Sequence, residues 1–301
     1  MDLKNNHTPQ ISRNRALVFA VLSTCFSSIA IIYHGLAAKA LPLTQAIATS
    51  HLLGAFILFC VIEFRSEKVD WKNLIQFRFD FVMALLCRFV VGGYILWCAM
   101  KLTIGVKAMF FTKAEPYFVL MWLWFFDRVT VSRGHLFLLL IHFSGAVLLS
   151  RGGFGTFDPT QWGDMLVLLA VSIMALSYRY SARLSSNIPT LHLTMSMQLV
   201  SGLIFLPFAF LEGPWAGFIA NSHGWFDVFM TVILWNLMGL PFWFVALKGL
   251  EGWLVSALRA LGPLLAAPIA IIFFDQSLNG VQIIGATIVL GTSFLLARER
   301  R

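Results

Sequence analysis

The sequence predicts an all-α membrane protein whose ten transmembrane helices form two inverted five-helix repeats. The first observation is composition: hydrophobic residues make up 59% of the chain, charged residues 12%, and the mean hydropathy is +0.81. A soluble domain of this size carries about twice that charge. The second is that apolar runs recur along nearly the whole length, which makes a soluble protein with one large core a poor alternative. The third is an internal repeat, described below.

Ten apolar segments each approach the ~20 residues that a helix needs to cross the bilayer core. Helices are favoured because lipid offers no partner for backbone N–H and C=O groups. The predicted spans are residues 15–36, 43–63, 79–100, 104–125, 134–151, 162–182, 190–211, 225–247, 253–274 and 279–297. Residues 1–14 and 298–301 are predicted tails, and 63–78 is the one obvious soluble connector. No cleavable signal peptide is visible, because the polar head leads straight into a span.

The distribution of basic residues predicts the orientation. With the N-terminus in the cytoplasm, fifteen of the 22 Lys and Arg residues fall on the cytoplasmic side and three outside. This bias follows the positive-inside rule and, with an even number of spans, places both termini in the cytoplasm. The other four lie within spans: Arg88, Lys107, Lys113 and Arg259. No basic run is long enough to favour nucleic acid as a partner.

Two stretches of the chain resemble each other. Residues 99–126 and 246–274 both start Ala-x-Lys, carry a proline at the same offset (Pro116 and Pro263), and lead into Phe-Phe-Asp at Asp127 and Asp275. Five spans per half is an odd number, so the second half must enter the bilayer inverted relative to the first. The predicted repeats are residues 15–151 and 162–297. Inverted repeats are typical of secondary transporters, which bind substrate near the midplane between the halves.

Three segments carry a family resemblance: "AEPYFVLMWLWFFDRVT", "WGDMLVLLAVSIMALSYRYSARL" and "ALKGLEGWLVSALRALGPLLAAPIAIIFFDQSLNGVQIIGATIVLG". In their order and spacing the chain resembles the EamA-type ten-helix branch of the drug/metabolite transporter superfamily, over roughly residues 15–297. The resemblance implies export or exchange of small metabolites by alternating access, without naming a substrate. Two features depart from the family: Gly262 replaces an acidic residue before Pro263, and the first span has no acid, which disfavours proton-coupled export of cationic drugs.

The segment "MFFTKAEPYFVL" places Lys113 and Glu115 in an apolar run, immediately before Pro116. Residues two apart on a helix do not face each other, so each charge needs a partner elsewhere. A charge near the bilayer centre is costly and marks a functional site by default. Pro116 and Pro263 cannot donate a backbone hydrogen bond, so each is predicted to break its helix. Such breaks are tolerated at membrane depth only beside protein or a watered cavity.

Arg88, Lys113 and Arg259 outnumber Glu115 within the spans, which leaves two positive charges in excess. This favours an anion or the carboxylate of a zwitterion as substrate, and the planar fork of Arg suits a carboxylate or phosphate. Three alternatives stay open: Arg88 pairs permanently with Glu115, Lys113 snorkels to the interface, or Arg259 does so on the cytoplasmic side.

Other residues within the spans are predicted to complete the substrate-binding wall. Aromatic rings suit a cavity lining, the amide of Asn236 lies beside a Gly-Leu-Pro break, and histidines titrate near neutral pH. Each of them could instead serve only in packing or interhelical hydrogen bonds. These residues are Tyr94, Trp97, Tyr117, Tyr178, Trp235, Asn236, Trp243, His34 and His51.

The sequence therefore favours a transporter that exports or exchanges a small polar metabolite, an amino acid or related carboxylate, across the bacterial inner membrane. An exporter of lipophilic drugs or toxins is the alternative within the same fold. An intramembrane enzyme is disfavoured, because the sequence lacks paired intramembrane aspartates and the common metalloprotease and hydrolase motifs. The expected partners are the small-molecule substrate and the lipid bilayer; no metal or cofactor is expected. A single chain holds both halves, so we expect a functional monomer, with dimerisation left open.

Overall fold

The computed structural model describes residues 11–67, 71–102, 111–128, 132–150, 162–262 and 280–298. Every regular element in these ranges is helical. Within the same ranges six helices are long and apolar enough to cross a membrane. The prediction of a helical membrane protein is confirmed at this level.

Several consecutive helices in the described ranges are joined by connections of one or two residues or by a continuous turn. α4 continues into α5 through a π-helical turn at Leu86–Val90, and α12 continues into α13 through a second π-helical turn at Val232–Gly239. The helices up to residue 150 are α1 (Arg13–Ala40), α2 (Leu43–Phe64), α3 (Trp71–Gln76), α4 (Arg78–Leu85), α5 (Val91–Leu102), α7 (Glu115–Asp127) and α8 (Arg133–Ser150). The later helices are α9 (Trp162–Asn187), α10 (Thr190–Glu212), α11 (Trp215–Ala220), α12 (Ser222–Thr231), α13 (Leu240–Leu247), α14 (Gly252–Leu258) and α16 (Gly280–Arg298).

The six candidate spans coincide with six of the predicted ones. They are Arg13–Ala40, Leu43–Phe64, Arg78–Leu102, Trp162–Asn187, Thr190–Glu212 and Ser222–Leu247. The predicted spans 104–125, 134–151, 253–274 and 279–297 lie partly outside the described residues, and α7, α8, α14 and α16 occupy the described parts. The predicted connector 63–78 contains the short helix α3.

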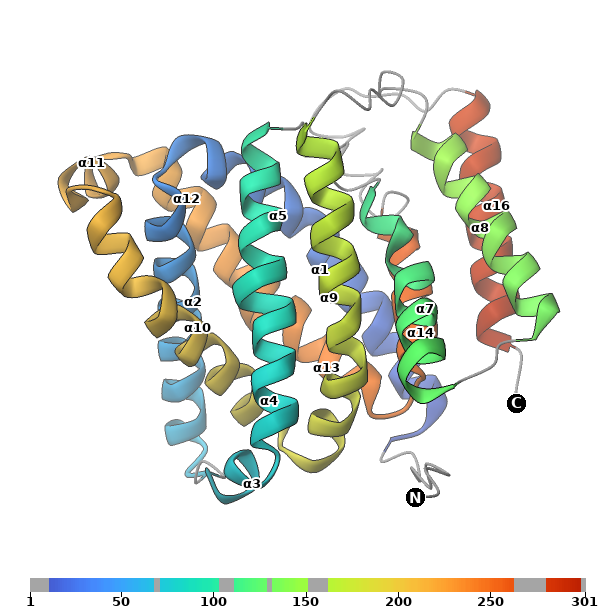
Figure 1. The fold of residues 1–301 in the computed structure, drawn as a ribbon, viewed down its shortest axis with the longest axis horizontal. Coiled ribbons are helices and arrows are strands. Elements are labelled where there is room, and N and C mark those ends of the chain that lie inside the picture. The colour runs from blue at the N-terminus through green and yellow to red at the C-terminus, as the bar shows by residue number, and fades with distance from the viewer. Residues whose placement is uncertain are drawn as a thin grey trace.

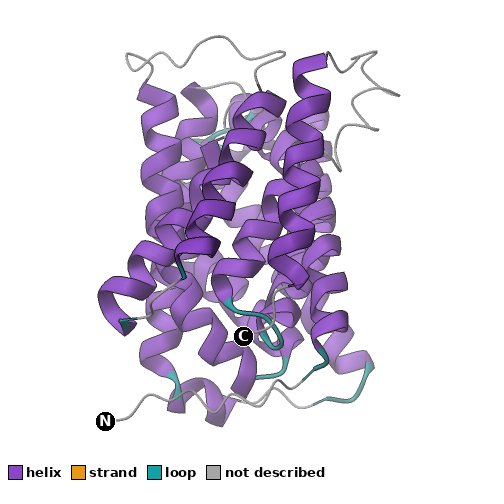
Figure 2. Ribbon diagram, turned by 90° about the vertical axis from the view of Figure 1, so that its right-hand side faces the viewer, coloured by secondary structure: helices purple, strands orange, loops and turns teal. Residues whose placement is uncertain are grey.

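The helices form a bundle in which segments distant in sequence lie side by side (Figure 1). α2 packs against α10, α8 against α16, and α7 against α14. Figure 2 shows that the helix axes are roughly aligned and that most connections lie at the two ends of the bundle. We call these the Arg13 end, where α1 begins, and the Ala40 end, where α1 finishes and α2 begins.

Glycine allows α2 and α10 to approach closely. A Cβ added at Gly54 would lie 2.0 Å from Gln198 Oε1, and one added at Gly202 would lie 2.7 Å from Leu52 Cδ2. Small residues at helix contacts are the usual way to bring backbones together in lipid, where apolar association is weak. On the outside of the bundle many large apolar side chains are exposed, such as Phe56, Phe137 and Phe208. A surface of this kind suits contact with hydrocarbon.

The chain just before Pro116 forms a 3₁₀ turn. This turn, Thr112–Ala114, leads into α7, and Pro116 lies in the first turn of that helix. Proline is tolerated there because the N–H it lacks would have no helical partner. A second 3₁₀ turn, Arg259–Leu261, follows α14. Pro263 and Asp275 lie outside the described residues, as does Lys107.

Candidate functional site

The centre of the site is the carboxylate of Glu115, at the start of α7. It is buried, with 5% of the residue exposed, yet it has three polar neighbours. Arg259 donates from Nη1 to Oε2 at 3.0 Å and to Oε1 at 3.4 Å. The hydroxyl of Tyr178, on α9, donates to Oε2 at 3.0 Å, and Arg88 Nη2 lies 3.6 Å from Oε1. Hydrogen bonds of this charge-assisted kind are the strong ones in proteins.

Arg88 lies in the π-helical turn between α4 and α5 and is almost fully buried. Its guanidinium carbon lies 4.0 Å from the ring centre of Trp243 and 5.2 Å from that of Tyr178. Nη1 also donates to the Ser177 hydroxyl at 3.2 Å. Because aromatic faces attract cations and the site is desolvated, this stacking fixes the guanidinium in place. Arg88 therefore holds Glu115 from one side and is itself held by α9 and α13.

Lys113 contacts the backbone of Arg259, not its side chain. Its ammonium donates to the backbone carbonyl of Arg259 at 2.9 Å, and only 7% of the residue is exposed. The side chain of Arg259, in turn, reaches back to Glu115. The two 3₁₀ turns therefore hold each other reciprocally. We call the four groups of Lys113, Glu115, Arg259 and Tyr178 the central clasp.

Gly262 makes room for this arrangement. A Cβ added there would lie 2.3 Å from the Ser28 hydroxyl oxygen and 2.9 Å from Lys113 Nζ. Any larger residue here, including the acidic one that the family resemblance leads one to expect, would require the side chains of Ser28 and Lys113 to shift.

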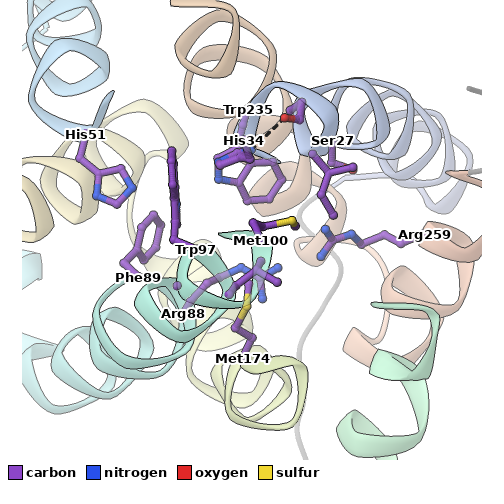
Figure 3. A pocket seen from close by; sticks show the side chains of 14 residues that line it. Ser27, His34, His51, Arg88, Phe89, Trp97, Met100, Met174, Trp235 and Arg259 are labelled. Carbon is purple, nitrogen blue, oxygen red and sulfur yellow. Dashed lines mark hydrogen bonds between the residues drawn. The ribbon is translucent and has the colours of Figure 1, made fainter. Parts of the chain in front are cut away.

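Two adjoining cavities open beside the central clasp. The larger, of about 80 Å³, extends along α1 and α5 from Arg88 toward the Ala40 end and is shown in Figure 3. The smaller, of about 50 Å³, lies against the 3₁₀ turn before α7. Ser27, Arg259 and Met174 line both cavities, so the two adjoin at this point. Figure 3 also shows Arg88 and Arg259 reaching the larger cavity from different helices, with their guanidinium groups directed toward each other.

Eight of the residues predicted to bind substrate line one or both cavities. They are Arg88, Lys113, Glu115, Arg259, Trp97, Trp235, His34 and His51. His34 is held by its Nδ1, which lies 2.9 Å from the Ala30 carbonyl oxygen, and its ring meets Trp97 edge-on. His51 lies 2.9 Å from the Ser201 hydroxyl, which links α2 to α10.

The structure places the other five predicted residues outside the lining of these two cavities. Tyr178 and Trp243 lie behind it, where they hold Glu115 and Arg88. The Asn236 amide donates to the Ser50 carbonyl and its backbone carbonyl accepts from Gln198, so it serves the packing of α2, α10 and the second π turn. Tyr117 donates to the Leu139 carbonyl on α8. Tyr94 is 39% exposed and stacks on Phe205.

Several lining residues were not predicted from the sequence. Ser27 and Ser28 on α1, Thr112 before α7, and Met100 and Met174 contribute hydroxyls and thioethers to the cavities. The adjacent hydroxyls in the acid-free first span were the available signal, because small polar side chains in a span tend to face other helices or water. The two methionines carry no such signal, since Met is an ordinary core residue.

Ionic contacts at the Arg13 end close the bundle below the site. Arg179 lies 2.7 Å from Asp127, and Arg183 lies 3.5 Å from Asp80 and 3.9 Å from Asp127. These contacts join the Arg13 ends of α4, α7 and α9.

A carboxylate fastens the Ala40 end. Glu212, at the end of α10, accepts from the backbone N–H of Leu43 at 2.7 Å and of Thr44 at 2.6 Å, and from the Thr44 hydroxyl at 2.5 Å. α2 begins after Pro42, which has no side-chain group for capping. A carboxylate at a helix N-terminus satisfies free N–H groups and complements the helix dipole. Glu212 thus caps α2 from a different helix.

Comparison with known proteins finds similarity to membrane transporters. Residues 161–298 match the model of the EamA-like transporter family. The uncharacterized transporter YetK of Bacillus subtilis is 21% identical over 228 residues, which cover 73% of this chain and 69% of YetK. A solved crystal structure of another protein superposes with a TM-score of 0.72 over 95% of this chain and 99% of its own, at 18% identity. The resemblance noted in the sequence is confirmed at residues 161–298, which are similar to the EamA-like transporter family.

Proposed function

We propose that this membrane transporter carries a small polar metabolite with a carboxylate group, an amino acid or related acid, by alternating access through the two cavities. The observation that carries the proposal is the central clasp. With Arg88 beside it, the clasp brings two arginines to one carboxylate and a lysine to the adjoining backbone, at the junction of the two halves and beside space that a solute can enter. A buried excess of positive charge is costly without a partner, so an anionic group is favoured there.

The proposal includes ten spans in two inverted repeats, and several described features support it. An offset of 147 residues relates Pro42 to Pro189, and each of these prolines directly precedes a helix. The same offset relates Lys101, in the last turn of α5, to Lys248, which directly follows α13. The same offset relates the 3₁₀ turn Thr112–Ala114 to Arg259–Leu261. When the first π-helical turn, Leu86–Val90, is shifted by the same offset, it falls within the second, Val232–Gly239.

The helix pairs agree with a two-fold axis between such repeats. Under this offset α2 corresponds to α10 and α8 to α16, and each of these helices packs against its own counterpart. The contact of α5 with α9 corresponds to that of α13 with α1. The axis then passes between the two 3₁₀ turns, where the central clasp lies. With both termini in the cytoplasm, as the basic residues favour, the cavities extend toward the outside of the cell.

Counterflow into proteoliposomes tests this function. Purified protein is reconstituted into vesicles loaded with a panel of unlabelled amino acids and organic acids, and entry of each labelled compound is followed. We expect uptake of at least one carboxylate above that of protein-free vesicles, and its loss in Arg259→Met but not in Arg65→Met, which removes an exposed arginine. Uptake of cations and neutral solutes alone would contradict the proposal.

A transporter of lipophilic drugs is the second candidate, and one observation favours it. The larger cavity presents Trp97, Trp235, Met100 and Met174, which together form an adaptable apolar wall. For such a substrate the aromatic positions matter and the basic ones do not. Loss of dye efflux in Trp97→Ala and Trp235→Ala, with Arg259→Met unaffected, would support this candidate against the first.

A further inference from the structure

The two cavities differ in chemical character. The smaller one holds three charged groups in little space: Lys113, Glu115 and Arg259 reach it, as do the hydroxyl-bearing residues Ser28 and Thr112. The larger one is lined by aromatic rings and thioethers, including Trp97, Trp235 and Met174, and the two arginines reach it as well. A solute that fills both cavities would therefore meet a charged end and an end rich in aromatic rings.

The charges around the smaller cavity are unequally matched. Glu115 already accepts hydrogen bonds from Arg259 and Tyr178. Lys113, by contrast, donates to a neutral backbone carbonyl. Among the described residues, no carboxylate oxygen lies within 4.0 Å of its ammonium nitrogen. An ammonium has three donors, so further hydrogen bonds are available to a ligand. A buried charge without a counter-ion is costly, and an incoming anion removes that cost.

Arg88 is less suited to contact the ligand. It is only 3% exposed, stacks on Trp243, donates to Ser177, and does not line the smaller cavity. Its guanidinium is thus committed to neighbours that hold Glu115. Lys113 is the cation that the geometry leaves for the ligand, with Arg259 at the boundary of the two cavities.

We infer that the smaller cavity binds the anionic group of the substrate, with Lys113 as its anchor, while the body of the substrate lies in the larger cavity. The inference rests on the proposed function and narrows its substrate to an organic anion with one compact charged group and an apolar or aromatic body. A water molecule needs about 10–15 Å³ on the same measure, so a space of about 50 Å³ suits a group of a few heavy atoms such as a carboxylate. The hydroxyl-bearing Ser28 and Thr112 line the same space.

Titration calorimetry of the purified, detergent-solubilised protein tests this assignment. The probes are 3-phenylpropionate, its neutral amide 3-phenylpropionamide, the amine 2-phenylethylamine, propionate as a charged group without a body, and sodium chloride as an inorganic anion. We expect 3-phenylpropionate to bind about tenfold or more tightly than the amide, the amine, propionate and chloride. The expected order follows from a charged hydrogen bond at one end and apolar burial at the other.

Two variants locate the site. Lys113→Met keeps the length of the side chain and removes its charge, and we expect it to weaken 3-phenylpropionate binding about tenfold or more. Lys101→Met makes the same change at an exposed position at the end of α5 and should bind as the wild type does. Should Lys113→Met fail to fold, Ser27→Leu decides, because it fills the junction of the cavities without removing a charge. Loss of binding in Ser27→Leu then supports the inference, and retention overturns it.

Three results overturn the inference: absence of 3-phenylpropionate binding to the wild type, equal binding of the amide, or unchanged binding in Lys113→Met. Chloride or propionate binding as tightly as 3-phenylpropionate would overturn the assignment of the body to the larger cavity. Counterflow keeps these failures apart from failure of the proposed function. If the vesicles still take up a carboxylate, only the anchor is wrong; if they take up none, the proposed substrate class is wrong.

Discussion

The guanidinium of Arg259 donates to the carboxylate of Glu115 at 3.0 Å, across 144 residues of sequence. Arg259 belongs to the second 3₁₀ turn, and Glu115 is the first residue of α7, directly after the first 3₁₀ turn. Arg88 holds the same carboxylate from another side at 3.6 Å. A single acid thus ties three helical segments together, and the consequences of removing it differ from those of removing either arginine.

Glu115→Gln should destabilise the protein markedly. The change leaves Arg88 and Arg259 buried beside a neutral amide, and breaking a buried ion pair in this way costs about 3–5 kcal/mol. We expect a clear fall in the melting temperature of the purified protein, measured by intrinsic fluorescence. Glu63→Gln removes an exposed acid from α2 and should leave the melting temperature within a degree or two. Equal melting temperatures for wild type and Glu115→Gln would show that the carboxylate is not part of a buried pair.

Arg88→Lys should not substitute for arginine. Lysine keeps the charge but lacks the planar group that stacks 4.0 Å from Trp243 and donates to Ser177. A double-mutant cycle with Trp243→Leu measures the contact, and we expect a coupling free energy of about 1–2 kcal/mol in thermal or denaturant unfolding. Additive effects of the two substitutions would mean that the stacking contributes nothing to stability.

Asp127→Asn should loosen the Arg13 end of the bundle. It removes the acid that Arg179 contacts at 2.7 Å and Arg183 at 3.9 Å, in pairs that are mostly but not fully buried. Pairs near a surface are worth up to about 1 kcal/mol, which corresponds to a fivefold change in an opening equilibrium. In a background without the four native cysteines, a cysteine placed at the buried Ser181 should react with maleimide about fivefold faster.

The control for this labelling is Glu63→Gln, which changes an exposed acid on α2. It should leave the rate at position 181 unchanged. A rate that is insensitive to Asp127→Asn would mean that these ion pairs do not hold the Arg13 end closed.

Glu212→Gln should weaken the start of α2. The carboxylate accepts from the N–H groups of Leu43 and Thr44, and Pro42 supplies no cap of its own. Loss of a helix cap costs about 0.5–2 kcal/mol. We expect faster hydrogen exchange at the amides of residues 43–45, measured by mass spectrometry, and little change at the start of α10. Uniform exchange across both helices would contradict a local cap.

Much of the fold could be predicted because the bilayer imposes a simple rule. Apolar runs of about 20 residues must be helices, and six such predicted spans coincide with long helices of the structure. The paired motifs around Pro116 pointed to a broken helix, and the 3₁₀ turn lies immediately before that proline. The π-helical turns could not be predicted, because no single residue type causes them.

The site was harder to predict than the spans. The charges of Arg88, Lys113, Glu115 and Arg259 drew attention because charge is costly in lipid. Their pairing depends on how helices far apart in sequence are placed, which hydropathy does not reveal. Tyr94 and Trp97 show the same limit: both lie on α5, but only Trp97 faces the larger cavity, while Tyr94 points outward. Ser28 was not predicted because a hydroxyl in a span, unlike a charge, is compatible with ordinary helix packing.

Uptake of a labelled carboxylate by proteoliposomes tests the central claim most directly, namely that the basic groups of the central clasp bind the anionic group of a transported solute. The measurement compares wild type, Arg259→Met and Arg65→Met at equal reconstituted amounts. The account predicts equal uptake by wild type and Arg65→Met, and a rate at least about tenfold lower in Arg259→Met, as expected for loss of a charged hydrogen bond. Equal uptake by all three proteins would contradict it.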